Sequence, residues 1–131
     1  MEKIIGYEEK NLAQYLGNSL MQIATFLQFD TEFIYSSDIK EKDCSLKGQD
    51  KVLNICKVLG ASEYFNAIGG MELYSKEYFA ECNIKLSFLK TQPIEYKQFK
   101  NTFVPYLSIL DVLMFNSVEE TNKLLTQFEL I

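Results

Sequence analysis

Apolar residues recur at helical spacing in five segments of the chain. In the first, which runs from residue 11 to about residue 29, one apolar stripe is formed by Leu12, Leu16, Leu20, Ile23 and Leu27. The same spacing, with polar caps at the starts and a glycine stop at Gly60, predicts helices over residues 49–59, 75–82, 108–115 and 117–128. We therefore expect a chain rich in short amphipathic helices.

Strand-like patterns separate these helices. Residues 32–36, 64–68 and 84–89 combine apolar side chains with period-two alternation, which is typical of strands. Because helices lie between the strands, parallel pairing through right-handed crossovers is favoured. Residues 92–105 contain both prolines and are expected to be an ordered loop or a weak strand pair. The pattern predicts an α/β fold with a small three-stranded, mostly parallel sheet flanked by helices, and with a C-terminal helical pair.

Length and composition indicate an ordinary globular protein. The 131 residues suit a single domain spanning residues 1–131, and 47% of them are apolar. No apolar run approaches the ~20 residues of a membrane helix, so no membrane partner is expected. The opening segment is too charged for a secretory signal. Three widely spaced cysteines, Cys44, Cys56 and Cys82, suit a reducing compartment, which predicts a cytoplasmic location.

Three residue types are absent, and their absence excludes several kinds of chemistry. The chain has no His, no Arg and no Trp, so it cannot by itself form a Ser-His-Asp triad, a His-containing zinc site or a bidentate guanidinium clamp. We expect no metal site. The net charge of -5 disfavours nucleic acid as a partner. The sequence does not identify a cofactor.

A Gly-Gly pair follows the second predicted strand. Ligands of open parallel sheets gather at the carboxyl ends of strands, and Gly69 and Gly70 would let backbone amides approach a phosphate or a sugar closely. Alternatively, the pair is a plain turn that needs a positive φ at one glycine. Tyr74, which comes shortly afterwards, either contacts a ligand ring or hydroxyl, or packs its own ring over the sheet edge.

The tetrapeptide Ser108-Ile109-Leu110-Asp111 also has two interpretations. Asp111 can act as a general base or as a ligand carboxylate. The S-x-x-D pattern before an apolar run is also typical of a helix cap with a reciprocal acidic partner. The segment from Tyr96 to Lys100 alternates aromatic, basic and amide groups. It either holds a sugar, a base or a single strand, or forms a solvated hairpin with Tyr96 and Phe99 turned inward.

The ordered combination of these segments resembles a known family. The strings IC-x2-LGAS-EYFNAIGG-MELY, F-x4-IKLSFL, IEYKQF and FVPYLSILDVLMFNS are similar to the C-terminal part of the WbqC-like proteins, and the resemblance extends from about residue 11 to residue 128. It implies a bacterial cytoplasmic protein associated with surface polysaccharide or O-antigen biosynthesis, in which aminosugars on nucleotide carriers are made. The family pattern is matched at Asn66, Gly69, Gly70, Tyr74, Tyr96, Gln98, Pro105, Ser108 and Asp111.

The resemblance implies roles for these residues. Asp111 is expected to be the catalytic residue, and the expected substrate-binding residues are Asn66, Gly69, Gly70, Tyr74, Tyr96, Gln98 and Ser108. The expected small-molecule substrate is a sugar or a nucleotide-linked sugar.

The chain departs from the family at its beginning. Family members are usually longer and open with a segment of the HQPxYxPW kind, which this sequence does not match. We therefore expect the chain to correspond to the C-terminal half of the family. It would be part of an enzyme, a non-catalytic module that docks onto a separately encoded N-terminal half, or an inactive remnant. A homo-oligomer is a further possible partner arrangement.

Overall fold

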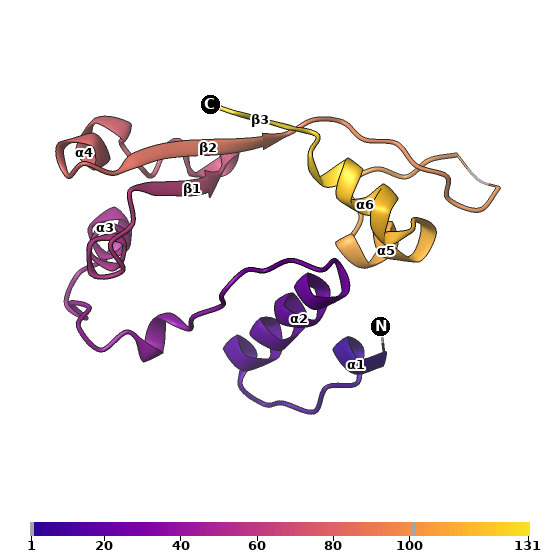
Figure 1. Ribbon diagram of the computed structural model, residues 1–131, viewed down its shortest axis with the longest axis horizontal. Helices are drawn as coiled ribbons and strands as arrows, with labels where there is room; N and C mark the ends of the chain where they lie inside the picture. Colours follow the sequence, from indigo (N-terminus) through magenta and orange to yellow (C-terminus); the bar gives the residue numbers. More distant parts are fainter. Residues whose placement is uncertain (1, 101) are drawn as a thin grey trace. The chain divides into compact units, whose positions relative to one another are not determined.

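The computed structural model describes residues 2–100 and 102–131 and shows a mixed α/β chain (Figure 1). The described residues fold into two compact units. We call residues 1–33 with 93–127 the helical unit, and residues 34–92 with 128–131 the sheet unit. The prediction of one domain over residues 1–131 stays a prediction.

The sheet unit contains a three-stranded sheet in the order β1 (Glu63–Ala67), β2 (Lys85–Thr91) and β3 (Phe128–Leu130). β1 and β2 are parallel, with Tyr64 opposite Leu86. β3 runs antiparallel to β2 and places Phe128 opposite Thr91. The predicted parallel pairing is therefore confirmed for β1 and β2. The third strand of the sheet is not one of the predicted strands, and it pairs antiparallel, so the sheet is not mostly parallel.

Two helices contribute to the core of the sheet unit. α3 (Gly48–Val58) and α4 (Lys76–Glu81) direct buried side chains against β2, and the resulting core consists of Leu53, Cys56, Phe79, Ile84, Leu86 and Phe88. Burial raises the pKa of the Cys56 thiol. A buried thiol held in its neutral form is a packing residue rather than a nucleophile.

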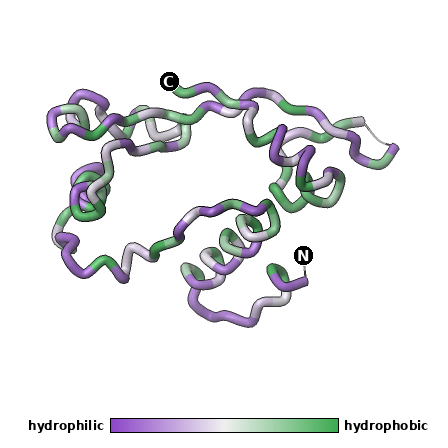
Figure 2. Tube along the Cα trace, viewed as in Figure 1, coloured by the Kyte–Doolittle hydropathy of each residue, from purple (hydrophilic) through white to green (hydrophobic). Residues whose placement is uncertain are grey.

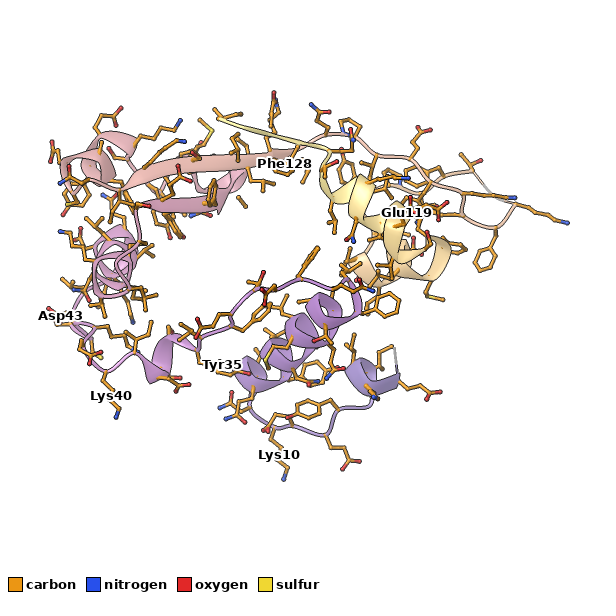
Figure 3. The ribbon with its side chains drawn as sticks, in the orientation of Figure 1. Lys10, Tyr35, Lys40, Asp43, Glu119 and Phe128 are labelled. Carbon is orange, nitrogen blue, oxygen red and sulfur yellow. The ribbon has the colours of Figure 1, made fainter. Side chains whose placement is uncertain are left out.

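The connection that precedes α3 is polar and largely exposed. It includes the 3-10 helix η1 (Ser36–Asp38), and it buries Ile39. Lys40 extends away from the backbone in Figure 3. Asp43 accepts hydrogen bonds from the backbone and hydroxyl of Ser45, and these bonds hold the pKa of that carboxyl below its usual value.

The helical unit consists of four helices: α1 (Glu2–Ile5), α2 (Leu12–Phe26), α5 (Ile109–Phe115) and α6 (Val118–Leu125). Asn11 caps α2 by accepting from the backbone of Ala13 and Gln14. Figure 2 shows both apolar and polar positions along α2, and the stripe residues Leu12, Leu16 and Leu20 remain exposed. Leu27, which follows α2, is 2% exposed and lies in the core of this unit.

One predicted strand is absent, and one predicted helix ends earlier than expected. Residues 32–36 form no strand, and Phe33 and Ile34 remain exposed. The C-terminal pair of helices is present, but the second helix ends at Leu125 and the chain continues into β3. β3 occupies the second side of β2, and its alternation covers only three residues, which is too short to distinguish from the end of a helix by periodicity.

Within the described residues, no helix has both the length and the apolar character needed to cross a membrane.

Candidate functional site

Two polar side chains of the helical unit converge on one carboxylate oxygen of Asp111. The phenol of Tyr96 donates to Oδ2 of Asp111 at 2.6 Å, and Nε2 of Gln98 donates to the same oxygen at 2.9 Å. Nε2 of Gln98 also lies 3.2 Å from the phenol oxygen of Tyr96. We call Tyr96, Gln98 and Asp111 the Asp111 cluster. The hydrogen bonds that its described neighbours make to the Asp111 carboxylate both end on Oδ2.

Gln98 holds the loop that carries the cluster. Its Oε1 accepts from the backbone N–H of Val104 at 2.8 Å, and its Nε2 donates to the Val104 carbonyl at 3.1 Å. The side chain is buried, at 9% exposure. Because both amide atoms are engaged by protein groups, the geometry suits Gln98 for positioning Tyr96 and Asp111 rather than for contacting a ligand.

Aromatic packing fixes the ring of Tyr96. The ring meets Phe103 edge-on, with centroids 5.1 Å apart, and lies 6.5 Å from Phe115. Burial and the hydrogen bond to Asp111 raise the pKa of the phenol above its usual value. The phenol therefore stays protonated at neutral pH and acts as a donor to the carboxylate.

The cap of α5 places Asp111 in the first turn of the helix. Oγ of Ser108 accepts from the backbone of Leu110 at 3.2 Å, and the Asp111 backbone donates to the Ser108 carbonyl. The cap half of the S-x-x-D interpretation is thus confirmed. The described contacts of the Asp111 carboxylate are instead with Tyr96 and Gln98, whereas Glu120 does bond back to Ser117 in α6. The carboxylate of Asp111 is therefore held by the cluster and not by the cap.

The Gly-Gly pair lies in the sheet unit, in the short helix η2 (Ile68–Gly70) directly after β1. Neither glycine has a positive φ, so the interpretation as a turn that needs one is wrong. Gly70 is buried, and a Cβ there would lie 3.0 Å from Cγ of Asn66. A Cβ at Gly69 would meet nothing within 4 Å. A side chain at position 70 would thus have to displace the Asn66 side chain.

Tyr74 packs on the core of the sheet unit. Its ring centroid lies 6.1 Å from that of Tyr64 and 6.2 Å from that of Phe79. It also borders a shallow depression of about 490 Å3, whose lining includes Gln49, Lys76 and Phe88. Tyr74 therefore packs its ring as the second interpretation predicts, and it also lines this depression.

One of the three comparisons with known proteins gave a match. The sequence model of the WbqC-like protein family matches residues 1–123. The chain belongs to the WbqC-like protein family. No curated protein and no solved structure matches the chain.

The WbqC-like chain thus presents two groups of expected site residues. Asn66, Gly69, Gly70 and Tyr74 lie within the sheet unit, and Tyr96, Gln98, Ser108 and Asp111 lie within the helical unit. The roles of these residues as catalytic or substrate-binding groups stay predictions.

Two residues of the site region were missed by sequence reasoning. Val104 contributes only its backbone, and its side chain gives no signal of this contact. Tyr64 accepts a hydrogen bond from Nδ2 of Asn66 at 3.3 Å, and period-two alternation with Asn66 places both side chains on one face of β1.

Among residues 2–100 and 102–131, no three His, Cys, Asp or Glu side chains are grouped to hold a metal ion.

Proposed function

We propose that this WbqC-like protein binds a sugar or a nucleotide-linked sugar in the bacterial cytoplasm and acts in surface polysaccharide or O-antigen aminosugar biosynthesis. The observation that supports this most directly is the Asp111 cluster, in which a phenol and an amide both donate to one carboxylate oxygen, Oδ2. Carboxylates in such settings accept hydrogen bonds from sugar hydroxyls or from the ammonium group of an aminosugar.

The carboxylate of Asp111 is the candidate acid/base group. With Oδ2 held by Tyr96 and Gln98, Oδ1 is oriented to take a proton from a hydroxyl or amine that reaches it. The chain has no His or Arg to complement this group. A second proton-transfer group would have to be a Tyr, Lys or Cys of this chain, or a residue of a second polypeptide.

The sheet unit supplies the second candidate binding region. Gly69 and Gly70 follow a strand that pairs in parallel, and ligands of such sheets gather at the carboxyl ends of strands. In this proposal Asn66 and Tyr74 border a phosphate or a sugar near the Gly-Gly pair.

Calorimetric titration with UDP-N-acetylglucosamine and with UDP tests this function. Wild-type protein is expected to bind the sugar nucleotide more tightly than UDP. Asp111→Asn should weaken binding by about tenfold, which corresponds to about 1.4 kcal/mol for one lost charge-assisted hydrogen bond. The matched control is Asp30→Asn, which changes an exposed acid of the same unit. Equal affinities for wild type and Asp111→Asn would remove Asp111 from the site.

A second candidate function is a docking module that completes another polypeptide. β1 is an edge strand of the sheet, and its Phe65 is 50% exposed. An open edge can pair with a strand from a second chain. Light scattering during size-exclusion chromatography, with and without a co-expressed polypeptide that carries an HQPxYxPW-type segment, tests this function. A monomer that ignores this polypeptide contradicts it, and a dimer of the chain alone indicates a homo-oligomer instead.

A further inference from the structure

Tyr106 combines a strained backbone conformation with a side chain that is almost fully exposed to solvent. Its φ is +60°, in the left-handed region that bulky residues rarely adopt, and the residue is 94% exposed. Glycine or asparagine would occupy this backbone conformation at lower cost. With so little of its surface covered, the ring gains almost nothing from packing that would offset the strain.

Phe99 provides an internal comparison. It also has a positive φ, of +39°, and it is 71% exposed. Its ring, however, meets Phe115 edge-on, with centroids 4.6 Å apart, and this contact accounts for an aromatic residue there. Packing against Phe115 therefore accounts for an aromatic residue at position 99. Packing does not account for the aromatic residue at position 106, where the side chain is almost fully exposed.

The chain holds Tyr106 close to the Asp111 cluster. On one side, Val104 is fixed by the amide of Gln98, and Pro105 restricts the backbone further. On the other side, Ser108 caps α5. Four residues separate Tyr106 from Asp111, and the last two of them already belong to α5, so the Cα atoms of Tyr106 and Asp111 lie at most about 12 Å apart. One sugar nucleotide can span this distance.

We infer that Tyr106 is a stacking platform for the flat face of the ligand that Asp111 binds. This inference rests on the proposed function. An aromatic ring and a carboxylate together recognise a ligand that has both a flat face and hydroxyl or amino groups. A pyranose ring and a nucleobase both present such a face, and the experiment below distinguishes them.

The absence of tryptophan from the chain gives a direct test. Tyr106→Trp introduces a single tryptophan at the proposed platform, and its emission can be excited selectively at wavelengths where tyrosine does not absorb. Its emission is expected to be quenched when UDP-N-acetylglucosamine is added. Titration with uridine monophosphate and with N-acetylglucosamine separately shows whether the base or the sugar lies on the ring. The control is Tyr7→Trp, at a half-exposed ring of the same unit that packs near Tyr15, and its emission should not change.

Affinity provides the second measurement. Tyr106→Ala should weaken binding of UDP-N-acetylglucosamine by about tenfold, as expected for the loss of one stacked ring, and Tyr106→Phe should restore it. Because the side chain is exposed, the melting temperature of Tyr106→Ala should not fall below that of wild type.

The outcomes separate the two claims. Wild-type affinity in Tyr106→Ala together with unchanged emission in Tyr106→Trp overturns the platform, while the proposed function stands if Asp111→Asn still weakens binding. If wild-type protein binds none of the probes, both the proposed function and the platform are wrong.

Discussion

The phenol of Tyr96 lies 2.6 Å from Oδ2 of Asp111, although the two residues are fifteen positions apart in the sequence. One residue comes from an irregular loop and the other from the first turn of α5. This bond joins the loop to the helix. Substitution of Tyr96 or of Gln98, which bonds to the same oxygen, should therefore lower the stability of the folded protein.

Tyr96→Phe removes the donor and keeps the ring. We expect a loss of about 1 kcal/mol in the free energy of unfolding, since one partly exposed hydrogen bond disappears while the contacts with Phe103 remain. Urea denaturation measures this difference. Tyr35→Phe, in the sheet unit, is the control and should leave the stability unchanged.

The stability difference between wild type and Tyr96→Phe should depend on pH. The pKa of Tyr96 in the folded protein lies above its usual value of 10.0, so folding favours the protonated phenol. The resulting stability is fully present below pH 10.0 and is lost as the pH rises through the folded-state pKa. Denaturation at about pH 8 and about pH 11 should therefore show a smaller difference at the higher pH. A constant difference would contradict the assigned role of the phenol.

Gln98→Glu tests the amide that holds the loop. The substitution replaces the donor Nε2 with a carboxylate oxygen beside Asp111 and the Val104 carbonyl. We expect a loss of about 2–3 kcal/mol at neutral pH, because two hydrogen bonds are replaced by repulsion at a buried position. Urea denaturation and its pH dependence check this, with partial recovery expected in acid. Gln127→Glu, which changes an exposed amide of the same unit, is the control.

The two neighbouring glycines should respond differently to alanine. Gly70→Ala places a Cβ 3.0 Å from the Asn66 side chain and should cost about 1 kcal/mol or more. Gly69→Ala meets open space and should be neutral or slightly stabilising. Thermal melts of both variants test the difference. If the double variant Asn66→Ala with Gly70→Ala does not recover stability, the Asn66 contact is not the cause.

The caps of α5 and α6 should also differ in strength. Ser117 and Glu120 form a complete capping box, whereas the Ser108 hydroxyl accepts a bond from Leu110 with no return bond from the Asp111 carboxylate among the described contacts. Ser117→Ala should therefore lose about 1 kcal/mol, and Ser108→Ala should lose less. Chemical denaturation of the two variants compares them. An equal or larger loss for Ser108→Ala would show that the cap contributes more than its single bond indicates.

Much of the fold could be predicted because its signals are local. The helix α2, the capping box at Ser117 and the strand β2 all follow from residues within a few positions of one another, although Ser87 of β2 is buried where the alternation predicts an exposed face. β3 could not be predicted, because three residues acquire strand character only through pairing with Leu89 to Thr91, far away in the sequence.

The three residues of the Asp111 cluster could be selected from the sequence, but their contacts could not. The pattern identified Tyr96, Gln98 and Asp111, and the structure brings these three together. It could not show that the Gln98 amide holds the Val104 backbone, because any residue type at position 104 other than proline offers the same backbone N–H and carbonyl groups. The sequence also could not show that the Asn66 side chain lies against Gly70, since this contact exists only in the folded chain.

The position of β3 in the sequence has a consequence for synthesis on the ribosome. Ile131 exchanges two backbone hydrogen bonds with Phe88, so the sheet unit is completed by residues that emerge only after the second segment of the helical unit. During translation, the free side of β2 must wait for its partner strand while α5 and α6 are still being made. A slow stretch of codons over residues 93–127 would lengthen the time during which this nascent edge is open to aggregation.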